Sequence, residues 1–504
     1  MRTRTAPPHQ PQLDRLIWVL SIIAAISLWV LPLHSHLWLD ETGSYWIIKD
    51  GFSQVIPRCM HWPQSILYSL LLCSVKTVFG ASEVALRLPS VVCMGASAFL
   101  LYKLALQLFD AAVAWIAVTF FVLLHPVAHA AADARPYALG LLAMMTATLL
   151  LIRWMDSRRW VYAVTYGLAA AAMIHAHYFA FGSALCVQIL YVAYRWWHGE
   201  RPATSQVVAI VLVFAASVAP LGPQFLFLQQ TRASHVFGVT PDYDALLGKL
   251  CPFYFAISII AGLVVTWLWR RNVSLRFRTY SSSALFLVLC WWLLPVLVGF
   301  LISVATPNKM FTDRYMISYT PGLSLSLALL VRSVEPVIAR RVIIALSALF
   351  VAGGLFVTNH IWHHSNDDWG AALNFVQAGT VQDGAPVLIC SQYVESDFMD
   401  WRALPLNQNV LFSPLSYYRV DANFVPLPSD FRPELPDYLD RFVSQTARRY
   451  SHFMLVSDRG SLPPFVYWLQ GRLGKNCRAE LKAEFGRIRV FEFKIPPDYS
   501  ATSK

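Results

Sequence analysis

Apolar runs long enough to cross a lipid bilayer recur along the first 358 residues, and they constrain the fold more than any other feature. A transmembrane helix needs about 17–25 residues, and in lipid its backbone polar groups must pair within the segment. Because 57% of the residues are apolar and only 14% charged, the sequence predicts a polytopic α-helical membrane protein. The predicted spans number about 11: 16–33, 87–108, 112–130, 136–152, 160–178, 181–197, 205–228, 250–269, 282–305, 315–331 and 342–358.

The basic residues predict the topology. A net charge of +11 is compatible with nucleic-acid binding, but short basic clusters between apolar runs are typical of cytoplasmic loops, so no nucleic-acid partner is expected. The run 63–80 is ambiguous, since it opens with Pro63 and carries Lys76. If it spanned, every later basic cluster would face outward, so we expect it to lie in the interface. The first outer loop is then about 34–86, with the N-terminus cytoplasmic and the C-terminus outside. No small-residue cleavage site follows the first run, so no cleavable signal peptide is expected.

The last third of the chain, 359–504, has a different character. "APVLICSQY" and "HFMLVSD" read as buried strands, "RIRVFEFK" as a half-exposed strand, and "DDWGAALNFVQAG" and "LPDYLDRFVSQTARR" as helices. We therefore predict two domains: a transmembrane module over 1–358 and a small extramembrane α/β domain over 359–504. Cys390 and Cys477 lie in this second domain, where a disulfide is possible in an oxidising compartment, although the sequence does not define the pairing.

Ionisable residues gather at the outer ends of the predicted spans. Such groups are costly at membrane depth and are functional by default, although ordinary interfacial residues in contact with water are the alternative. The group consists of Asp40, Glu41, His61, Arg87, Asp133, Arg135, His175, His177, Asp313 and Arg314.

The adjacent acids Asp40 and Glu41 follow the first span. A carboxylate there is able to act as a general base toward an acceptor hydroxyl. A hard divalent cation would need several oxygen ligands, and the loop adds only the distant Asp50, so a metal is weakly supported and none is predicted. The alternative for Glu41 is a role at the start of a short helix over about 41–49, near Thr42 and Ser44.

The arginines suit a phosphate carried on a lipid, because guanidinium groups bind phosphate bidentately and stay charged when poorly hydrated. Arg87, Arg135 and Arg314 are the candidates; the alternative is ion pairing of Arg135 with Asp133 and of Arg314 with Asp313. His175 and His177 are two residues apart and point to different sides of a helix, so they do not predict a metal pair. His177 with Tyr178 is predicted to line a cavity.

Six motifs in a fixed order carry a family resemblance: "WLDE", "HWPQSILYSLL", "ALRLPS", "ADARPYAL", "DRYMISYTPGL" and "DDWGAALNFV". From residue 30 to about 400, the chain resembles the bacterial polyprenyl-phosphate-sugar-dependent GT-C glycosyltransferases, which include protein O-mannosyltransferase-like proteins and lipid A aminoarabinose transferases. The absence of a DxD motif places it nearer the metal-independent members.

The resemblance implies an inverting glycosyltransferase with a GT-C-like fold in the bacterial inner membrane and a periplasmic C-terminal domain. It would move a sugar from a polyprenyl-phosphate donor to a hydroxyl of a lipid, glycan or protein acceptor. Asp40 would be the catalytic base with Glu41 beside it, and Arg87, Arg135 and Arg314 would hold the donor phosphate. The predicted substrate cavity is lined by His61, Asp133, Tyr137, His177, Tyr178 and Tyr315.

A non-catalytic flippase or scramblase for lipid-linked sugars is the alternative. It would use the same arginines for phosphate, but it would also need polar residues along a path through the membrane. The midpoints of the apolar runs hold few such residues. A transferase of the acyl or phosphoethanolamine type would need a nucleophile or metal cluster, for which the sequence offers no plausible candidate.

Overall fold

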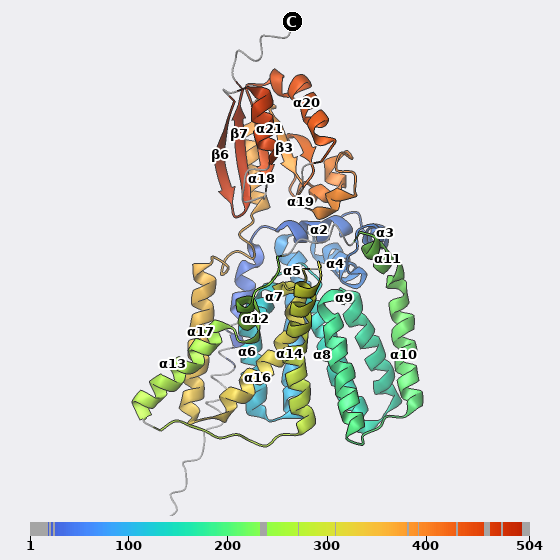
Figure 1. Ribbon diagram of the computed structural model, residues 1–504, viewed down its shortest axis with the longest axis vertical. Helices are drawn as coiled ribbons and strands as arrows, with labels where there is room; N and C mark the ends of the chain where they lie inside the picture. Colours follow the sequence, from blue (N-terminus) through green and yellow to red (C-terminus); the bar gives the residue numbers. More distant parts are fainter. Residues whose placement is uncertain are drawn as a thin grey trace, which may run out of the picture.

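A computed structural model of the chain describes residues 19, 22–23, 26–231, 239–270, 272–307, 309–380, 383–391, 393–429, 432–457, 464–474 and 477–495. Figure 1 shows a bundle of long helices at one end and a mixed sheet with helices at the other, joined by a layer of short helices. The first outer loop forms most of that layer.

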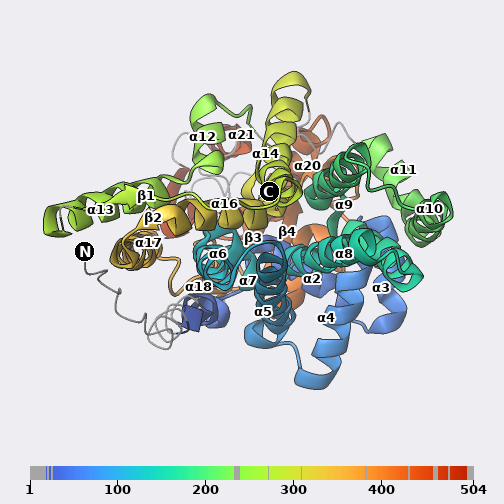
Figure 2. The same cartoon turned by 90° about the horizontal axis from the view of Figure 1, so that it is seen from below.

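The helical part runs from η1 to α17. Its helices are η1 Leu31–His34, α2 Leu39–Ile48, α3 Phe52–His61, α4 Ile66–Phe79, α5 Glu83–Leu108, α6 Ala111–Leu123, α7 His125–Ala131, α8 Tyr137–Ser157, α9 Trp160–Trp197, α10 Thr204–Val218, η2 Ala219–Leu221, α11 Gly222–Thr231, α12 Tyr243–Leu250, α13 Phe253–Arg270, α14 Ser282–Ala305, α15 Asp313–Met316, η4 Ile317–Tyr319, α16 Thr320–Ser333 and α17 Val337–Val357. Two short strands, β1 Ser274–Leu275 and β2 Val334–Glu335, pair antiparallel at the end of the bundle far from the mixed sheet. Viewed from below, α13 and α10 lie on opposite sides of a centre formed by α6, α7 and α16 (Figure 2).

Six helices of the described residues are long and apolar enough to cross a membrane, or eight if each of two bent helix pairs counts as one span. One of the six, α9, contains two of the predicted spans, because its helical backbone is interrupted at His177. Arg195 near its end pairs with Asp156, at 3.0 Å, just before its start, so the two halves of α9 run antiparallel. The predicted span 315–331 is divided among the end of α15, η4 and the 14-residue helix α16, and 16–33 is described only in part.

The ambiguous run 63–80 forms α4, a helix of 14 residues. At 1.5 Å per residue this is about 21 Å, less than the roughly 30 Å of a hydrocarbon core. Ser65 caps its start by accepting a hydrogen bond from the Tyr68 amide, and Gly80 ends it with φ of +81°, a backbone conformation that favours glycine. The length of α4 agrees with an interfacial helix.

The C-terminal part contains a five-stranded sheet. Its elements are α18 Trp369–Thr380, β3 Pro386–Cys390, η5 Val394–Asp397, η6 Leu406–Gln408, η7 Val410–Phe412, α19 Ser413–Tyr417, β4 Asn423–Leu427, α20 Leu435–Gln445, η8 Ala447–Arg449, β5 His452–Ser457, α21 Pro464–Leu473, β6 Arg478–Phe485 and β7 Ile488–Lys494. The strand order is β4-β3-β5-β7-β6, with β3 parallel to β4 and β5 and the other pairs antiparallel. The predicted strands correspond to β3, β5 and β7, and the predicted helices to α18 and α20.

No disulfide joins Cys390 and Cys477. Cys390 ends β3 and Cys477 directly precedes β6, and the sheet order places β5 and β7 between these strands. Three strand spacings of about 4.8 Å separate them by about 14 Å, whereas a disulfide needs Cα atoms within about 7 Å.

The first outer loop shares an apolar core with the C-terminal sheet. Buried side chains of α2, α3 and α4, such as Ile47, Val55 and Leu72, belong to the same cluster as Trp369 and Val387. Burying this apolar surface is the main force that docks the sheet onto the loop. The loop is therefore positioned from both sides, by the helix bundle and by the C-terminal part.

Polar contacts add specificity to this docking. The Tyr393 hydroxyl donates to the Leu39 carbonyl at 2.8 Å, the Thr42 and Ser413 hydroxyls are 2.8 Å apart, and the Leu37 amide donates to the Tyr418 hydroxyl at 2.7 Å. Each contact joins the start of α2 to the C-terminal part.

The docking also includes a titratable pair, His36 Nδ1 and Asp368 Oδ1, 2.7 Å apart. The hydrogen bond to Asp368 raises the pKa of His36 above 6.5, against the opposing effect of burial. Burial alone would raise the pKa of Asp368, but the hydrogen bonds from His36 and the Ala371 amide lower it below 3.8. The His36 contribution is thus complete below pH 6.5 and is lost as pH rises through its raised pKa; that of Asp368 is present above pH 3.8.

We therefore expect the docking to weaken as the pH rises above about 6.5. Limited proteolysis of segment 358–368 in the purified protein should accelerate between pH 6 and pH 8. The acceleration should be smaller in His36→Asn and unchanged in His34→Asn, which removes an exposed histidine. Identical pH profiles for the wild type and His36→Asn would contradict this assignment.

Candidate active site

Asp40 lies in the first turn of α2 and faces two arginines. Its Oδ2 atom is 2.5 Å from Arg314 Nη1 and 4.0 Å from Arg135 Nη2. The Asp40 side chain is 18% exposed and that of Arg314 is 31% exposed, so the carboxylate is reachable from outside. We call Asp40, Arg135 and Arg314 the Asp40 cluster.

Arg135 is positioned by the first outer loop. Its Nη1 atom donates to Gln64 Oε1 at 3.0 Å and lies 3.4 Å from both the Asp40 carbonyl and the Ser44 hydroxyl. Its Nε atom is buried without a hydrogen-bond partner among the described residues. Sequence reasoning did not single out Gln64, although it lies within the quoted motif "HWPQ".

Aromatic rings border the cluster. Tyr137 stacks on His177 with ring centroids 5.2 Å apart, and Tyr315 lies 5.3 Å from the same ring. The Arg314 guanidinium is 5.3 Å from the Tyr315 ring, a cation–π distance. Tyr178 points to Phe225, 4.8 Å away. The structure thus gathers Tyr137, His177 and Tyr315 around the cluster, with Tyr178 at its edge.

The electrostatics of the cluster favour an anion. Burial disfavours the charged form of Arg314, but the Asp40 carboxylate outweighs it and raises the pKa of Arg314; the pKa of Arg135 is raised in the same way. Both guanidinium groups therefore stay charged, and with one carboxylate between them the cluster carries one net positive charge.

Close packing fixes the direction of α2. A Cβ atom added at Gly43 would lie 2.5 Å from the Trp62 ring and 2.7 Å from the Tyr393 hydroxyl, so no side chain fits there. The Trp62 indole in turn donates to Glu395 Oε1 at 3.2 Å. Tyr393 and Glu395 belong to the C-terminal part, and no sequence motif marked them as neighbours of the site.

The structure places the predicted site residues Glu41 and Arg87 against each other, outside the Asp40 cluster. Both side chains are fully buried and form a bidentate pair, with Nη2–Oε2 at 2.6 Å and Nε–Oε1 at 2.7 Å. The remaining Arg87 donors bind the carbonyls of Pro32, Leu33, Ser35 and His36 and the Ser35 hydroxyl. No donor of Arg87 remains for a ligand.

Glu41 has the alternative role at the start of a helix. Its carboxylate accepts the Trp38 amide at 3.3 Å, as the third residue of α2, and the Ala134 amide at 2.8 Å. It therefore fixes the first turn of α2 against the segment that carries Arg135. Asp40, the residue before Glu41, projects in a different direction, toward Arg135 and Arg314.

Two predicted cavity residues have partners outside the Asp40 cluster. His61 is exposed at the end of α3, where its ring bonds the Pro57 carbonyl within its own helix. Asp133 is buried, accepts the Trp38 indole N–H at 3.1 Å and lies 3.4 Å from His364 Nε2. The proposed local ion pairs are replaced by distant ones: Arg135 and Arg314 face Asp40, while Asp313 pairs with Lys249.

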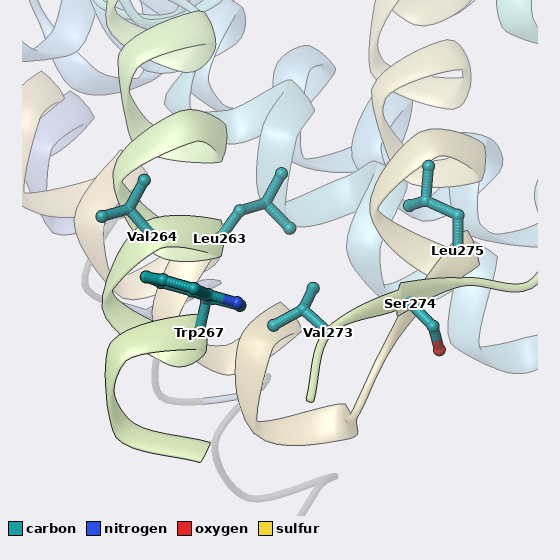
Figure 3. Close-up of a pocket in the computed structure, with 6 residues that line it drawn as sticks. All are labelled: Leu263, Val264, Trp267, Val273, Ser274 and Leu275. Carbon is teal, nitrogen blue, oxygen red and sulfur yellow. The ribbon is translucent and has the colours of Figure 1, made fainter. Parts of the chain in front are cut away.

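A cavity of about 520 Å³ is not part of this arrangement. It lies between α13 and the segment 273–275 and is lined by Leu263, Val264, Trp267, Val273, Ser274 and Leu275 (Figure 3). These residues are at the end of the bundle far from the C-terminal sheet (Figure 1). The lining is apolar and offers no chemistry for catalysis.

Known proteins share both sequence and architecture with this chain. Residues 63–221 match the family model of dolichyl-phosphate-mannose-protein mannosyltransferase. ArnT from Cupriavidus metallidurans bound to undecaprenyl phosphate has a TM-score of 0.53 at 11% identity, over 98% of this chain and 100% of that chain. Its apo state has a TM-score of 0.54 at 11% identity, over 98% and 99%. The chain has the GT-C glycosyltransferase fold.

The predicted fold class, a polytopic helical GT-C-like membrane protein with a small C-terminal α/β part, is thereby confirmed. The family match bears out the prediction of a membrane glycosyltransferase. The oligosaccharyltransferase of Archaeoglobus fulgidus tethered with an acceptor peptide is less similar, with a TM-score of 0.44 at 12% identity over 89% of this chain and 69% of that chain. No curated protein sequence matches the chain.

Proposed function

We propose that this chain is an inverting glycosyltransferase that moves a sugar from a polyprenyl-phosphate donor to an acceptor hydroxyl. The observation that supports it best is the Asp40 cluster: one reachable carboxylate held between two charged guanidinium groups. One similar solved structure is of ArnT bound to undecaprenyl phosphate, a lipid phosphate of the class that this cluster suits.

The donor phosphate would bind at Arg314. This side chain is the more exposed of the two arginines in the cluster, and a bidentate guanidinium–phosphate contact neutralises charge efficiently in a poorly hydrated site. During transfer the carrier phosphate leaves with a full negative charge. The net positive charge of the cluster would stabilise that charge as it develops.

Asp40 would deprotonate the acceptor. Its Oδ2 atom faces the arginines, whereas its Oδ1 atom has no hydrogen-bond partner among the residues described. A hydroxyl bound within about 3 Å of Oδ1 would give its proton to Asp40 as its oxygen attacks the anomeric carbon. The bond from that carbon to the phosphate oxygen breaks on the opposite side, which inverts the anomeric centre.

The orientation belongs to the same proposal. The N-terminus would be cytoplasmic, and the C-terminal domain, 359–504, would be periplasmic on a bacterial inner membrane. The acceptor, whether a lipid, glycan or protein, would reach the Asp40 cluster from the side of the C-terminal domain. Basic clusters at the opposite ends of the helices support this orientation.

The test is transfer by membranes that contain the protein, compared with membranes that lack it. With undecaprenyl-phosphate-linked sugars as donors, mass spectrometry of envelope lipids, glycans and proteins should show one added sugar. Arg314→Gln should raise the KM for the donor about 10- to 100-fold, because a charge-assisted hydrogen bond contributes about 1.5–3 kcal/mol. Arg402→Gln, at an exposed arginine of the C-terminal part, is the control.

Movement of lipid-linked sugar across the bilayer without any transfer would contradict this proposal and favour a flippase. An unchanged KM in Arg314→Gln would remove Arg314 as the phosphate contact.

A further inference from the structure

Three metal-ligating side chains from distant parts of the chain meet beside the Asp40 cluster. They are His129 in α7, Asp133 in the turn that follows, and His364 in the segment between α17 and α18. One ligand atom of each lies within 4.8 Å of those of the other two. Asp133 and His364 are buried and His129 is half-buried. The sequence predicted no metal site, because the residues considered were Asp40, Glu41, His175 and His177.

The residue types suit zinc better than a hard cation. Two imidazoles and one carboxylate form a ligand set that zinc binds tetrahedrally, leaving a fourth position, whereas Mg²⁺ and Ca²⁺ prefer oxygen ligands throughout. His129 and Asp133 are four residues apart, the spacing that brings side chains to one face of a helical turn.

The separation of His364 Nε2 and Asp133 Oδ1 fits a shared ion. His364 Nε2 and Asp133 Oδ1 are 3.4 Å apart, and this buried nitrogen has no hydrogen-bond partner among the described residues. Ligands about 2.1 Å from one tetrahedral ion are separated by about 3.4 Å. A buried polar atom without a partner is costly, and a coordinated ion would provide that partner.

The surroundings provide space and support. A cavity of about 20 Å³ next to the three residues is lined by His129 and His364, together with His125 and His360, and its volume is enough for one small ion or water. Asp133 is not among the residues that line it. The Trp38 indole N–H donates to Asp133 Oδ1 at 3.1 Å and so orients the carboxylate. Hydrogen bonds of this kind to the ligands are typical of metal sites.

We propose that His129, Asp133 and His364 bind one zinc ion. The ion would join α7 to the segment that leads into the C-terminal sheet. Arg135 is two residues after Asp133, and Asp40 is two residues after Trp38, which bonds Asp133. The ligands thus adjoin the Asp40 cluster, and this inference does not depend on the proposed function.

The experiment uses the full-length protein in detergent, purified without a polyhistidine tag. After incubation with Zn²⁺ and desalting, elemental analysis should find about one zinc per chain. His129→Asn with His364→Asn should abolish it, whereas His34→Asn with His61→Asn, which removes two exposed histidines, should retain it. Loaded with Co²⁺ instead, the wild type should show the visible absorption of a tetrahedral ion, and X-ray absorption of the zinc form should show two imidazoles and an oxygen ligand.

The X-ray absorption and cobalt measurements use only the wild type, so they remain decisive if the ligand variants fold poorly. The thermal unfolding temperature of the wild type should also fall when a chelator removes the ion. The proposal is overturned if the wild type retains no metal, if the His129→Asn/His364→Asn variant retains it, or if the absorption spectra show no imidazole ligands.

Discussion

Asp40→Asn is expected to lower kcat for sugar transfer by about 10²–10⁴-fold, the usual contribution of a positioned general base. Asparagine keeps the size of the side chain and an oxygen that can accept the hydrogen bond from Arg314, so the fold of α2 should persist. The proton of the acceptor would have no carboxylate to receive it. Measuring initial rates against donor concentration separates kcat from KM.

The KM for the donor distinguishes the loss of a base from a general disturbance of the site. Removing the carboxylate changes the net charge of the Asp40 cluster from one positive charge to two, so donor phosphate should bind as well as in the wild type or better. A variant that merely disturbed the site would weaken donor binding as well. Asp50→Asn, an acid of the same loop that pairs with Arg58, serves as the control and should keep its kcat. A kcat for Asp40→Asn within threefold of the wild type would remove Asp40 as the base.

Arg87→Met should destabilise the protein by about 3–5 kcal/mol, the range for breaking a buried ion pair from one side. The variant leaves the Glu41 carboxylate buried without its cation and deprives the carbonyls of Pro32, Leu33, Ser35 and His36 of their donor. Arg402→Met removes one partner of an exposed pair and should cost about 0–1 kcal/mol. Denaturant unfolding in detergent, followed by tryptophan fluorescence, measures both.

The double variant Arg87→Met/Glu41→Gln distinguishes charge from packing. Because removing the second charge eliminates the uncompensated carboxylate, the double variant should be more stable than Arg87→Met alone. Recovery should be partial, since the four carbonyls still lack a donor. If the double variant is as unstable as the sum of both single variants, the pair does not stabilise the loop through its charges.

These two predictions concern neighbouring acids that the sequence presents as equivalents. Asp40 and Glu41 follow the same span, and Arg87 and Arg314 both lie at outer helix ends. The sequence indicates the different roles of Asp40 and Glu41 only in part. A glutamate at the third residue of a helix suggests a cap, but no local pattern shows which arginine binds which acid. Which acid Arg87 binds depends on the position of α5 beside η1. In that position the Arg87 guanidinium donates to the carbonyls of residues 32–36 and has no donor left for a ligand.

The proposed zinc ligands His129, Asp133 and His364 were likewise only partly predictable from the sequence. His125, His129 and Asp133 recur every four residues, which is visible in the sequence as one helical face. His364 completes the set from the segment between α17 and α18, and no periodicity predicts that meeting.

The sequence by itself determined the helical membrane architecture, the strands β3, β5 and β7, and Asp40, Arg135 and Arg314 as members of one group of ionisable residues at helix ends. These follow from local rules: apolar length, strand alternation and the cost of charge in lipid. Only the tertiary structure decided that Glu41 and Arg87 form an internal clamp, that His61 faces outward, and that Tyr393 and Trp62 hold α2 in place. The reason is physical. The partners of a buried charge come from elements that are far apart in the chain, and the local sequence does not determine the distances between such elements.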